Sequence, residues 1–302
     1  MDLLASVIIP THNRRGLVAK TLASLLNQTA AAASFEVVVV DDGSTDGTRE
    51  SIEEFRQRAP WQLNYVYQQN AGRARARNAG ILAARGELVI FLDSDMVVVP
   101  GYVQAHLDAH KRPDLIVPGR VIETYNHSNP FSEPFKIRDM SRASFATGNV
   151  SVARARLIEA GLFDTDFVEY GWEDLELGQR LRNLGLAVAR SAEALSYHLK
   201  RPERAADVPS VVRMEKERGH MALLFYKKHP TRHVRLMTMY PGFFFLDRLT
   251  ALGHWPDQPG TNRLLAWLER TGKRRLFSLI MTVVRNHAYA DGLREALAKG
   301  KV

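Results

Sequence analysis

The stretch Leu88-Val89-Ile90-Phe91-Leu92-Asp93-Ser94-Asp95 decides the predicted fold. Five consecutive apolar residues are typical of a strand that is buried on both faces. Short apolar runs also occur at 6–9 and 35–40, and segments with helical spacing of Leu, Val and Ala separate the runs. This alternation predicts an α/β fold, in which a mostly parallel sheet is flanked by helices on both faces.

The ends of the predicted strands carry polar and acidic residues. The first strand ends at 10–13, the second at Asp41-Asp42-Gly43-Ser44, and the fourth at Asp93-Ser94-Asp95. Ligands bind beyond the carboxyl ends of the strands in such sheets, so we expect a ligand crevice there. Two carboxylates one residue apart can hold Mg²⁺ or Mn²⁺, which prefer oxygen ligands and substrate phosphate. A polar turn is the alternative for one such triplet, but two acidic strand ends favour the metal site.

The composition excludes several classes of protein. The chain has 302 residues, of which 45% are hydrophobic and 25% charged, as is usual for a globular protein. It has no cysteine, so disulfides, zinc–thiolate sites and a cysteine nucleophile are excluded. No apolar run is long enough to span a bilayer, and no signal-peptide pattern opens the chain. These features predict a cytoplasmic protein.

The charge is distributed unevenly. From Lys200 to Val302 the sequence has 20 Lys and Arg against 9 Asp and Glu, whereas the preceding residues have 21 against 24. Residues 208–302 are also helical in pattern and rich in aromatic residues. We therefore predict two domains, an α/β ligand-binding domain over residues 1–200 and a basic, aromatic-rich, mainly helical extension over 201–302. A basic region suits an anionic partner but does not choose among nucleic acid, lipid and phosphorylated ligands.

Four motifs in order resemble a known family. They are Ser6-Val7-Ile8-Ile9-Pro10-Thr11-His12-Asn13, Val39-Val40-Asp41-Asp42-Gly43-Ser44-Thr45-Asp46, Asn70-Ala71-Gly72 with Ala76-Arg77-Asn78-Ala79-Gly80, and Phe91-Leu92-Asp93-Ser94-Asp95. Their order and spacing over roughly the first 190 residues are similar to those of the family-two inverting glycosyltransferases, which have the GT-A (Rossmann-like) fold. The last hundred residues carry no motif of that family.

The resemblance implies a nucleotide-sugar donor, most often a UDP-sugar, and a Mn²⁺ or Mg²⁺ ion at a DXD motif. It implies that the donor is bound by residues at the strand ends and the third motif, namely Pro10, Thr11, Asp41, Asp42, Gly72, Arg73, Arg77, Asp93 and Ser94. Asp42 would accept a hydrogen bond from the uracil ring, and Asp95 would be a metal ligand. His198 lies where related enzymes supply a further metal ligand, although a lone histidine is more often structural.

The segment Tyr170-Gly171-Trp172-Glu173-Asp174 opens a predicted helix over Glu173–Leu184. Acidic residues in a first helical turn are stabilised by the helix dipole, so capping is the alternative reading. Sugar transfer requires a general base that removes the proton of the acceptor hydroxyl, and the resemblance places that base at Asp174. Such a carboxylate is expected to be ionised at neutral pH and weakly basic.

The acceptor side is predicted at two places. Glu173 is expected to orient the acceptor and Trp172 to stack on a sugar ring, with a core anchor as the equal alternative for Trp172. Gly148 and Asn149 resemble the family's Gly-Asn segment near donor and acceptor, with an ordinary strand turn as the alternative. The predicted function is metal-dependent, inverting hexosyl transfer to a sugar, lipid-linked or other hydroxyl acceptor in polysaccharide, glycolipid or cell-envelope glycan synthesis.

Two other functions are kept as alternatives. A sugar-phosphate nucleotidyltransferase would use a similar sheet and metal, but residues 10–13 lack the glycine-rich triphosphate loop of that class. A non-enzymatic nucleic-acid-binding protein would explain the basic extension, but not the carboxylates at the strand ends, which repel phosphates. We therefore expect no nucleic-acid partner.

The aromatic segment Met237–Leu246 lies among basic residues in the extension. Aromatic residues beside Lys and Arg suit a membrane interface, which predicts peripheral attachment to an anionic bilayer on the inner face of the cell membrane. A helical subdomain with an aromatic core and a homodimer contact are the alternatives.

Overall fold

The computed structural model describes residues 3–136, 139 and 143–298. Its contacts divide the chain into two compact units: Met1–Asp166 with Glu173–Arg201, and Phe167–Trp172 with Pro202–Val302. The predicted boundary at residue 200 places all earlier residues in one domain. In the structure the segment 167–172 instead packs with residues from 202 onward. No helix within the described ranges is both long and apolar enough to cross a lipid bilayer.

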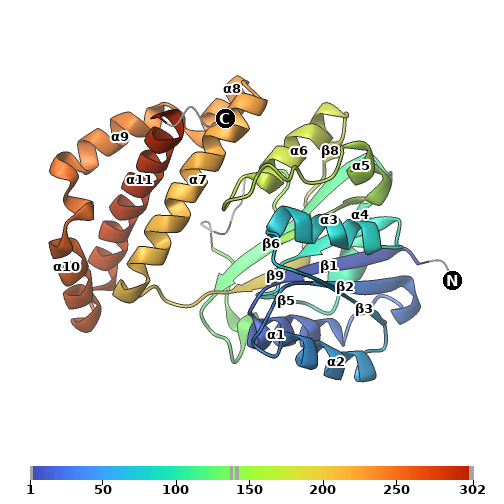
Figure 1. Ribbon diagram of the computed structural model, residues 1–302. Coiled ribbons are helices and arrows are strands. Elements are labelled where there is room, and N and C mark those ends of the chain that lie inside the picture. The colour runs from blue at the N-terminus through green and yellow to red at the C-terminus, as the bar shows by residue number, and fades with distance from the viewer. Residues whose placement is uncertain (1–2, 137–138, 140–142, 299–302) are drawn as a thin grey trace. The chain divides into compact units, whose positions relative to one another are not determined.

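The first unit is built on a single sheet (Figure 1). Within the described residues its strands are β1 (Ala5–Thr11), β2 (Phe35–Asp42), β3 (Gln62–Gln68), β4 (Leu88–Leu92), β5 (Met96–Val98), β6 (Leu115–Thr124), β7 (Asn149–Ala153), β8 (Ala187–Val188) and β9 (Ser191–Leu199). Their order is β3-β2-β1-β4-β7-β6-β9-β5, and β8 pairs with β6. The pairs among β3, β2, β1 and β4 are parallel, while β7 is antiparallel to both β4 and β6.

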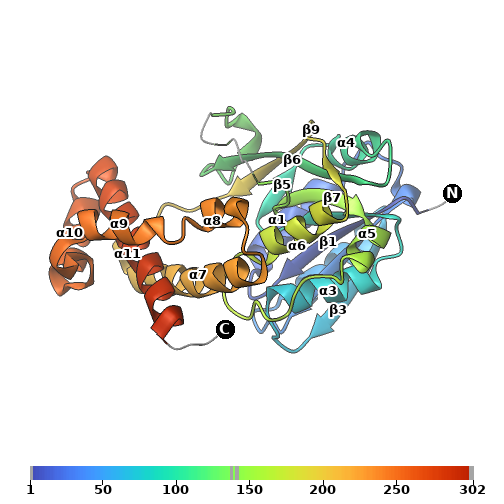
Figure 2. The ribbon, with the colours of Figure 1, turned by 90° about the horizontal axis from the view of Figure 1, so that it is seen from above.

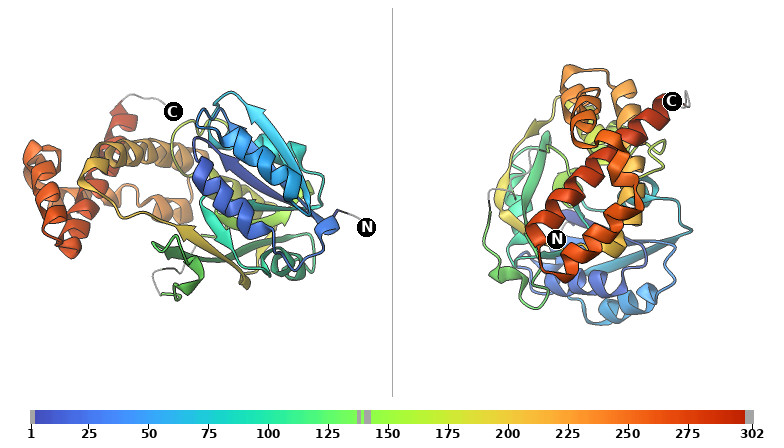
Figure 3. Two further views of the ribbon diagram at one scale, coloured as in Figure 1. Left: turned by 90° about the horizontal axis from the view of Figure 1, so that it is seen from below. Right: turned by 90° about the vertical axis from the view of Figure 1, so that its left-hand side faces the viewer.

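Helices cover both faces of this sheet, as predicted. They are α1 (Arg15–Leu25), α2 (Thr48–Arg58), α3 (Arg73–Ala83), α4 (Tyr102–Ala109), α5 (Arg154–Glu159) and α6 (Glu173–Asn183), with short 3₁₀ segments η1 (Ala32–Ser34) and η2 (Pro130–Ser132). Side chains of α1, α2 and α4 share one apolar cluster with the odd-numbered residues of β1, and those of α3, α5 and α6 share another with Ile8. Figure 2 shows α3 and α6 over one face, and the left panel of Figure 3 shows α1 and α2 over the other.

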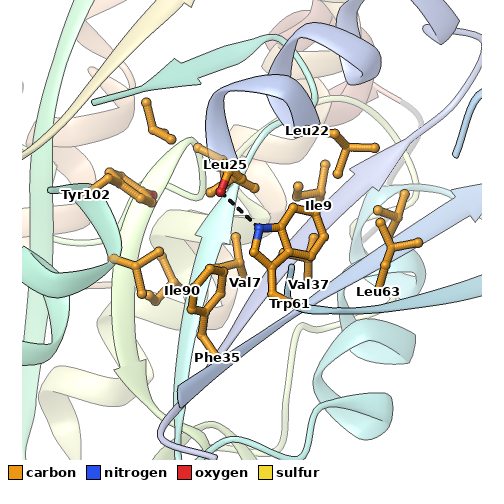
Figure 4. Packing of buried hydrophobic residues seen from close by; sticks show 14 of the residues in the cluster. Val7, Ile9, Leu22, Leu25, Phe35, Val37, Trp61, Leu63, Ile90 and Tyr102 are labelled. Carbon is orange, nitrogen blue, oxygen red and sulfur yellow. Dashed lines mark hydrogen bonds between the residues drawn. The ribbon is translucent and has the colours of Figure 1, made fainter. Parts of the chain in front are cut away.

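The first apolar cluster shows why these strands are buried (Figure 4). The inward side chains of β1 and β2 pack against Leu22 and Leu25 of α1. The Trp61 ring lies 6.1 Å from the Phe35 ring, and its Nε1 donates a 2.9 Å hydrogen bond to the Leu25 carbonyl. Because the buried indole N–H has a hydrogen-bond partner, burying the Trp61 ring stabilises the cluster without the cost of an unpaired donor.

Several predicted elements differ in the structure. The stretch 123–142 is polar, contains proline and has weak periodicity, which predicts a loop. In the structure it begins inside β6, which continues to Thr124, and it contains η2; its residues 137–138 and 140–142 lie outside the described residues. The strand β5 follows the DXD triplet directly and was not predicted. It has three residues and pairs antiparallel with β9, a partner about a hundred residues away, so local periodicity carries little sign of it.

The second unit is helical. It contains α7 (Val208–Lys228), α8 (Arg232–Thr238), α9 (Gly242–Thr250), α10 (Pro259–Arg270) and α11 (Arg274–Ala298), with 3₁₀ segments η4 (Ala205–Asp207) and η5 (Leu252–Asp257). The long helices α7 and α11 run side by side, as Figure 1 shows. Their backbones approach closely at Gly219 and Gly292, where an added Cβ would collide with backbone atoms of the facing helix. Glycine at both positions is therefore required by this packing.

Candidate active site

The acidic end of β2 is tied into the protein framework. Asp41 and Asp42 are both buried. The Asp41 carboxylate accepts hydrogen bonds from the Ser44 N–H (2.8 Å) and the Tyr65 hydroxyl (2.8 Å). It therefore fixes the turn that follows β2 and links that turn to β3. Both oxygens of Asp41 are thus engaged by the chain itself.

Asp42 organises the start of α3. Its Oδ1 accepts from Gln68 Nε2 (2.7 Å) and the Ala71 N–H (2.8 Å), and its Oδ2 accepts from the Gly72 N–H (3.0 Å). Gly72 has φ +89° and ψ 167°, a conformation that essentially only glycine adopts, and no atom lies within 4 Å of where its Cβ would be. A carboxylate has about four acceptor positions, so Asp42 keeps room for one further donor.

The predicted nucleotide-contacting residues lie beside this turn. Pro10 is half-buried at the end of β1, opposite Val40 in the register with β2. Thr11 is buried, and its Oγ1 has no hydrogen-bond partner among the described residues. Arg73 is exposed in the first turn of α3. A buried hydroxyl without a partner is unfavourable, and a bound polar ligand would satisfy it.

The acidic end of β4 faces cations instead of neutral donors. Asp95 Oδ2 lies 2.6 Å from Arg14 Nη1 and 3.4 Å from His198 Nε2. Antiparallel pairing of β5 with β9 sets Met96 opposite His198, and the Leu199 N–H donates to the Asp95 carbonyl at 2.9 Å. The strand pairing thus explains why two residues 103 positions apart in sequence meet.

Electrostatics keep the Asp95 carboxylate charged. Burial opposes ionisation, but the hydrogen bond and charge of His198 and the charge of Arg14 outweigh burial and lower the Asp95 pKa to about 2. A carboxylate and an imidazole at this separation are suitable donors for Mn²⁺, and the ion would take over the neutralising role of Arg14. The donor set at Asp95 and His198 therefore fits the divalent ion that the motif implies.

Asp93 is linked to the start of α6 through a buried arginine. Arg77 donates from Nη2 to Asp93 Oδ1 (3.2 Å) and from Nη1 to Glu173 Oε1 (2.8 Å), and its guanidinium carbon lies 5.7 Å from the Phe163 ring centroid. The Arg77 Nε has no partner among the described residues. Ser94, between the two aspartates, is buried and accepts a hydrogen bond from Thr21 at its carbonyl (3.0 Å).

Glu173 is thus engaged by the protein interior. Its side chain is buried and its Oε1 pairs with Arg77, so it orients that arginine, and its role toward the acceptor stays a prediction. Asp174 is half-buried beside it, and its Oδ1 accepts from the Leu175 N–H at 2.7 Å. Burial and the neighbouring charge of Glu173 raise the Asp174 pKa to about 7, against the lowering effect of Arg77.

This value corrects the expectation of a fully ionised, weakly basic Asp174. The sequence pattern showed only the helix N-terminus, which favours the charged form. Packing added desolvation and a second carboxylate, and both favour the protonated form. A carboxylate with a pKa near 7 is a stronger base than an exposed one and is better matched to proton transfer at neutral pH.

Asn149 of the Gly-Asn segment was predicted to lie near the donor and acceptor, but its side chain makes hydrogen bonds inside the first unit. The Asn149 side chain is buried; its Nδ2 donates to the Ala194 carbonyl (2.9 Å) and Ser196 Oγ (2.8 Å), and its Oδ1 lies 3.0 Å from His106 Nε2. Burial lowers the His106 pKa to about 3, so this network is neutral. Asn149 therefore joins β7 to β9 and has no amide hydrogen left for an acceptor. Gly148 is the member near the site, because a Cβ there would lie 3.5 Å from Asp93 Oδ2.

Trp172 belongs to the second unit. The ring is buried, lies 5.9 Å from the Phe225 ring, and donates from Nε1 to the Arg218 carbonyl at 2.9 Å. This is the core-anchor alternative, so the proposed stacking of Trp172 on a sugar ring is not supported. The sequence could not decide between the two because a tryptophan before a helix suits either.

Sequence reasoning missed Arg14 and the partners of the β2 end, Tyr65 and Gln68. Arg14 follows the first predicted strand by a few residues, so the strand-end rule that selected Asp95 could also have selected it. Tyr65 and Gln68 lie on β3, where alternating polar residues are common, and only pairing with β2 reveals their role.

Comparison with known proteins shows a family match over the first half of the chain. The family model described as Glycosyl transferase family 2 matches residues 6–153. Validoxylamine A glucosyltransferase of Streptomyces hygroscopicus subsp. jinggangensis (strain 5008) is 33% identical over 270 residues, which cover 76% of this chain and 61% of that enzyme. The chain thus spans less than two thirds of this relative's length.

Solved structures show the same fold. The mannosyltransferase PcManGT from Pyrobaculum calidifontis, in complex with GDP-Man and Mn²⁺, superimposes with a TM-score of 0.67 at 19% identity, covering 100% of this chain and 89% of that one. Residues 1–349 of S. aureus TarS, in complex with UDP, give a TM-score of 0.54 at 19% identity and cover 99% of this chain and 92% of that one. Residues 6–153 of this chain therefore form a glycosyl transferase family 2 domain, and the unit that contains them has the GT-A fold.

Proposed function

We propose that the chain is a metal-dependent, inverting glycosyltransferase that moves a sugar from a nucleotide-sugar to an acceptor hydroxyl. The observation that carries this proposal is the meeting of two groups at the β4 end. One is the pair of Asp95 and His198, whose donor atoms suit a divalent ion, and the other is the buried bridge from Asp93 through Arg77 to Glu173 beside Asp174. The relatives named above, a glucosyltransferase and a mannosyltransferase, support this reaction class.

The donor is proposed to lie between the β1 and β2 ends and the start of α3. Thr11 Oγ1 and the remaining acceptor position of Asp42 would bind the nucleoside, and the open face of Gly72 lets a phosphate or ribose approach the backbone. Arg73 and Arg77 Nε would add positive charge or a donor on the diphosphate side. TarS binds UDP and PcManGT binds GDP-Man, and for this chain we propose a UDP-sugar.

Asp95 and His198 would hold Mn²⁺ or Mg²⁺, which when bound supplies positive charge to the leaving nucleotide diphosphate. Asp174 takes the proton of the acceptor hydroxyl as that oxygen attacks the anomeric carbon. The attack and the departure of the nucleotide diphosphate occur in a single in-line displacement, so the configuration inverts and no covalent enzyme intermediate forms. Arg77 holds Glu173 and Asp93 in place, while burial and the charge of Glu173 raise the pKa of Asp174.

A donor panel tests this proposal. We expect Mn²⁺-dependent transfer or hydrolysis, or at least protection from heat, with one of UDP-, GDP- and dTDP-sugars, and UDP-sugars should give the largest effect. Binding of a nucleoside triphosphate with release of pyrophosphate would instead support the nucleotidyltransferase alternative. Salt-sensitive retention on DNA, independent of nucleotide and Mn²⁺, would support the nucleic-acid-binding alternative.

For the second unit we propose contact with an anionic bilayer on the inner face of the cell membrane, which would bring a lipid-linked acceptor within reach. The aromatic segment is partly packed and partly exposed. The Phe243 ring centroid lies 4.7 Å from that of Tyr289, whereas Phe245 and Leu249, one turn apart on α9, are 71% and 58% exposed. The side chain of Leu246 lies outside the described residues. Flotation with anionic vesicles at low salt should carry the chain upward, and a Phe245→Ser variant should float less; sedimentation as a dimer without flotation would favour the homodimer contact.

A further inference from the structure

A group of metal-ligating side chains lies in the second unit, on elements that the proposed reaction does not use. His254 and Asp257 lie on η5, and His287 lies on α11. One ligand atom of each, an imidazole nitrogen or a carboxylate oxygen, lies within 4.8 Å of the others. Three side chains from two segments thus converge on one point.

His287 is held in the orientation that a metal ligand needs. The imidazole is 2% exposed, and its Nδ1 lies 2.7 Å from Asp247 Oδ1 on α9. Arg294 Nη2 lies 2.5 Å from the other Asp247 oxygen and fixes that carboxylate. Metal-binding histidines commonly donate one ring N–H to a carboxylate, which fixes the tautomer and turns the second nitrogen toward the ion.

The second nitrogen, His287 Nε2, faces Asp257 Oδ2 at 2.9 Å. His254 Nδ1 lies 3.9 Å from the same oxygen. In a tetrahedral zinc site with bonds of about 2.0–2.1 Å, neighbouring ligand atoms are about 3.4 Å apart. The exposed side chains of His254 and Asp257 can rotate by the small amount required, while His287 stays fixed by its buried partner.

We propose that His254, Asp257 and His287 form a zinc site that joins η5 to α11. Two imidazoles and one carboxylate are ligands that Zn²⁺ accepts, and the solvent-exposed side of the cluster leaves the fourth position to water. The ion replaces the proton that otherwise lies between His287 Nε2 and Asp257 Oδ2.

Nearby positive charge is already balanced. Lys216 of α7 lies 3.9 Å from Asp291 Oδ2, an oxygen that also lies 3.7 Å from His287 Nε2. Arg294 lies 2.7 Å from Asp291 Oδ1 and also pairs with Asp247. The cations that face the cluster from α7 and α11 are therefore paired with carboxylates that are not ligands. The site is independent of the proposed sugar transfer, because all of its residues lie in the second unit.

The test measures zinc binding to the full chain after removal of metals with a chelator. Asp95→Asn is used as the background so that ions at Asp95 and His198 do not contribute. Competition with a chromophoric chelator should give one Zn²⁺ per chain, and Co²⁺ should give the visible absorption of a four-coordinate site. Adding His254→Gln should weaken zinc binding at least tenfold and abolish that absorption.

His233→Gln is the matched control, because His233 is an exposed histidine of α8 outside the cluster. It should leave both signals unchanged. Asp257→Asn should act as His254→Gln does, and neither exposed change should prevent folding, which circular dichroism checks. The proposal is overturned if the parent binds no zinc, or if His254→Gln binds zinc as tightly as the parent; the cluster is then a proton-bridged ion-pair network.

Discussion

The two acidic strand ends of the sheet look alike in sequence and differ in what their carboxylates contact. At the end of β2, Asp41 and Asp42 accept hydrogen bonds from the backbone, Tyr65 and Gln68. At the end of β4, Asp93 and Asp95 face charged or chargeable groups, and their oxygens are close to nitrogens of Arg77, Arg14 and His198.

The difference shows that the groups around a buried carboxylate determine whether it stabilises the fold or can bind a ligand. Neutral donors that belong to the fold cannot leave, so the β2 end stabilises a turn and offers little free capacity. A cation at a partly exposed carboxylate can be exchanged for another cation, so the β4 end can take a metal ion. A change at Asp41 should therefore cost stability, and a change at the β4 end should cost activity.

The largest effect on activity is expected at Asp174, which follows Glu173, the residue that Arg77 links to Asp93. Asp174→Asn removes the proposed base and should lower kcat by about 10²–10⁴-fold, the usual contribution of general-base catalysis. Nucleotide affinity, measured by calorimetry, should remain within about twofold. Asp108→Asn, the same chemical change on an exposed position of α4, is the control. Full activity of Asp174→Asn would show that the base is another residue.

Asp95→Asn should come next. Loss of a metal ligand should lower the Mn²⁺-dependent rate by about 10²-fold or more, because a bound ion contributes several kcal/mol to charge stabilisation in the transition state. Because His198 and Arg14 lower the Asp95 pKa to about 2, loss of the carboxylate should also lower the free energy of unfolding at pH 7, by about 1–2 kcal/mol. Titration with Mn²⁺ and thermal unfolding measure the two quantities. A large loss of stability with normal metal binding would make Asp95 a framework residue like Asp41.

The pH dependence should show the raised pKa of Asp174. Activity should rise with pH up to about 7, close to tenfold per unit on the acidic side, because only the ionised carboxylate accepts a proton. Between about pH 4 and 7 the folded chain keeps a proton that the unfolded chain has lost, so the free energy of unfolding should fall as pH rises. Rate profiles and urea unfolding curves, each compared with Asp174→Asn, test both trends; a flat rate profile between pH 5.5 and 7 contradicts the first.

At the β2 end the expected effect is on stability. Asp41→Asn removes a carboxylate that accepts two hydrogen bonds in a buried place and should lower the free energy of unfolding by about 1–3 kcal/mol. Tyr65→Phe should cost less in the Asp41→Asn background than in the parent, because the shared bond is already lost. Metal affinity should not change. Additive effects in this double-mutant cycle would rule out the coupling of Asp41 to Tyr65.

The smallest effect is expected at Arg14. Arg14→Gln removes the cation that lies against Asp95, so Mn²⁺ should bind about two- to fivefold more tightly, the factor that corresponds to a partly exposed ion pair. Free Mn²⁺ can be measured by electron paramagnetic resonance, with Arg75→Gln, an exposed arginine of α3, as the control. Weaker binding in Arg14→Gln would indicate that Arg14 supports the ion instead of competing with it.

Part of the candidate site was predictable because it depends on short stretches of consecutive residues. The strand ends that carry Asp42, Asp93 and Asp95 follow runs of apolar residues, and the sheet rule brings those ends to one edge. The helix that starts at Glu173 was confirmed as α6, and the family resemblance was confirmed by the match over residues 6–153. The roles of individual site residues stay predictions that the experiments above test.

The rest depended on contacts between residues far apart in the chain. Pairing of β5 with β9 brings His198 to Asp95, and packing of Arg77 against Glu173 turns that glutamate inward. An acceptor role was expected for Asn149 from the family resemblance and for Trp172 from its flat ring, but hydrogen bonds inside each unit engage their polar groups.

The sequence by itself determined the α/β order of the first unit, the positions of its acidic strand ends and the basic character of the last hundred residues, because these are properties of consecutive residues. Only the tertiary structure decided which carboxylates are saturated and which face exchangeable cations, why the pKa of Asp174 rises, and that His254, Asp257 and His287 meet. The physical reason is that burial, charge pairing and ligand geometry depend on neighbours in space, and the chain brings those neighbours together only when it folds.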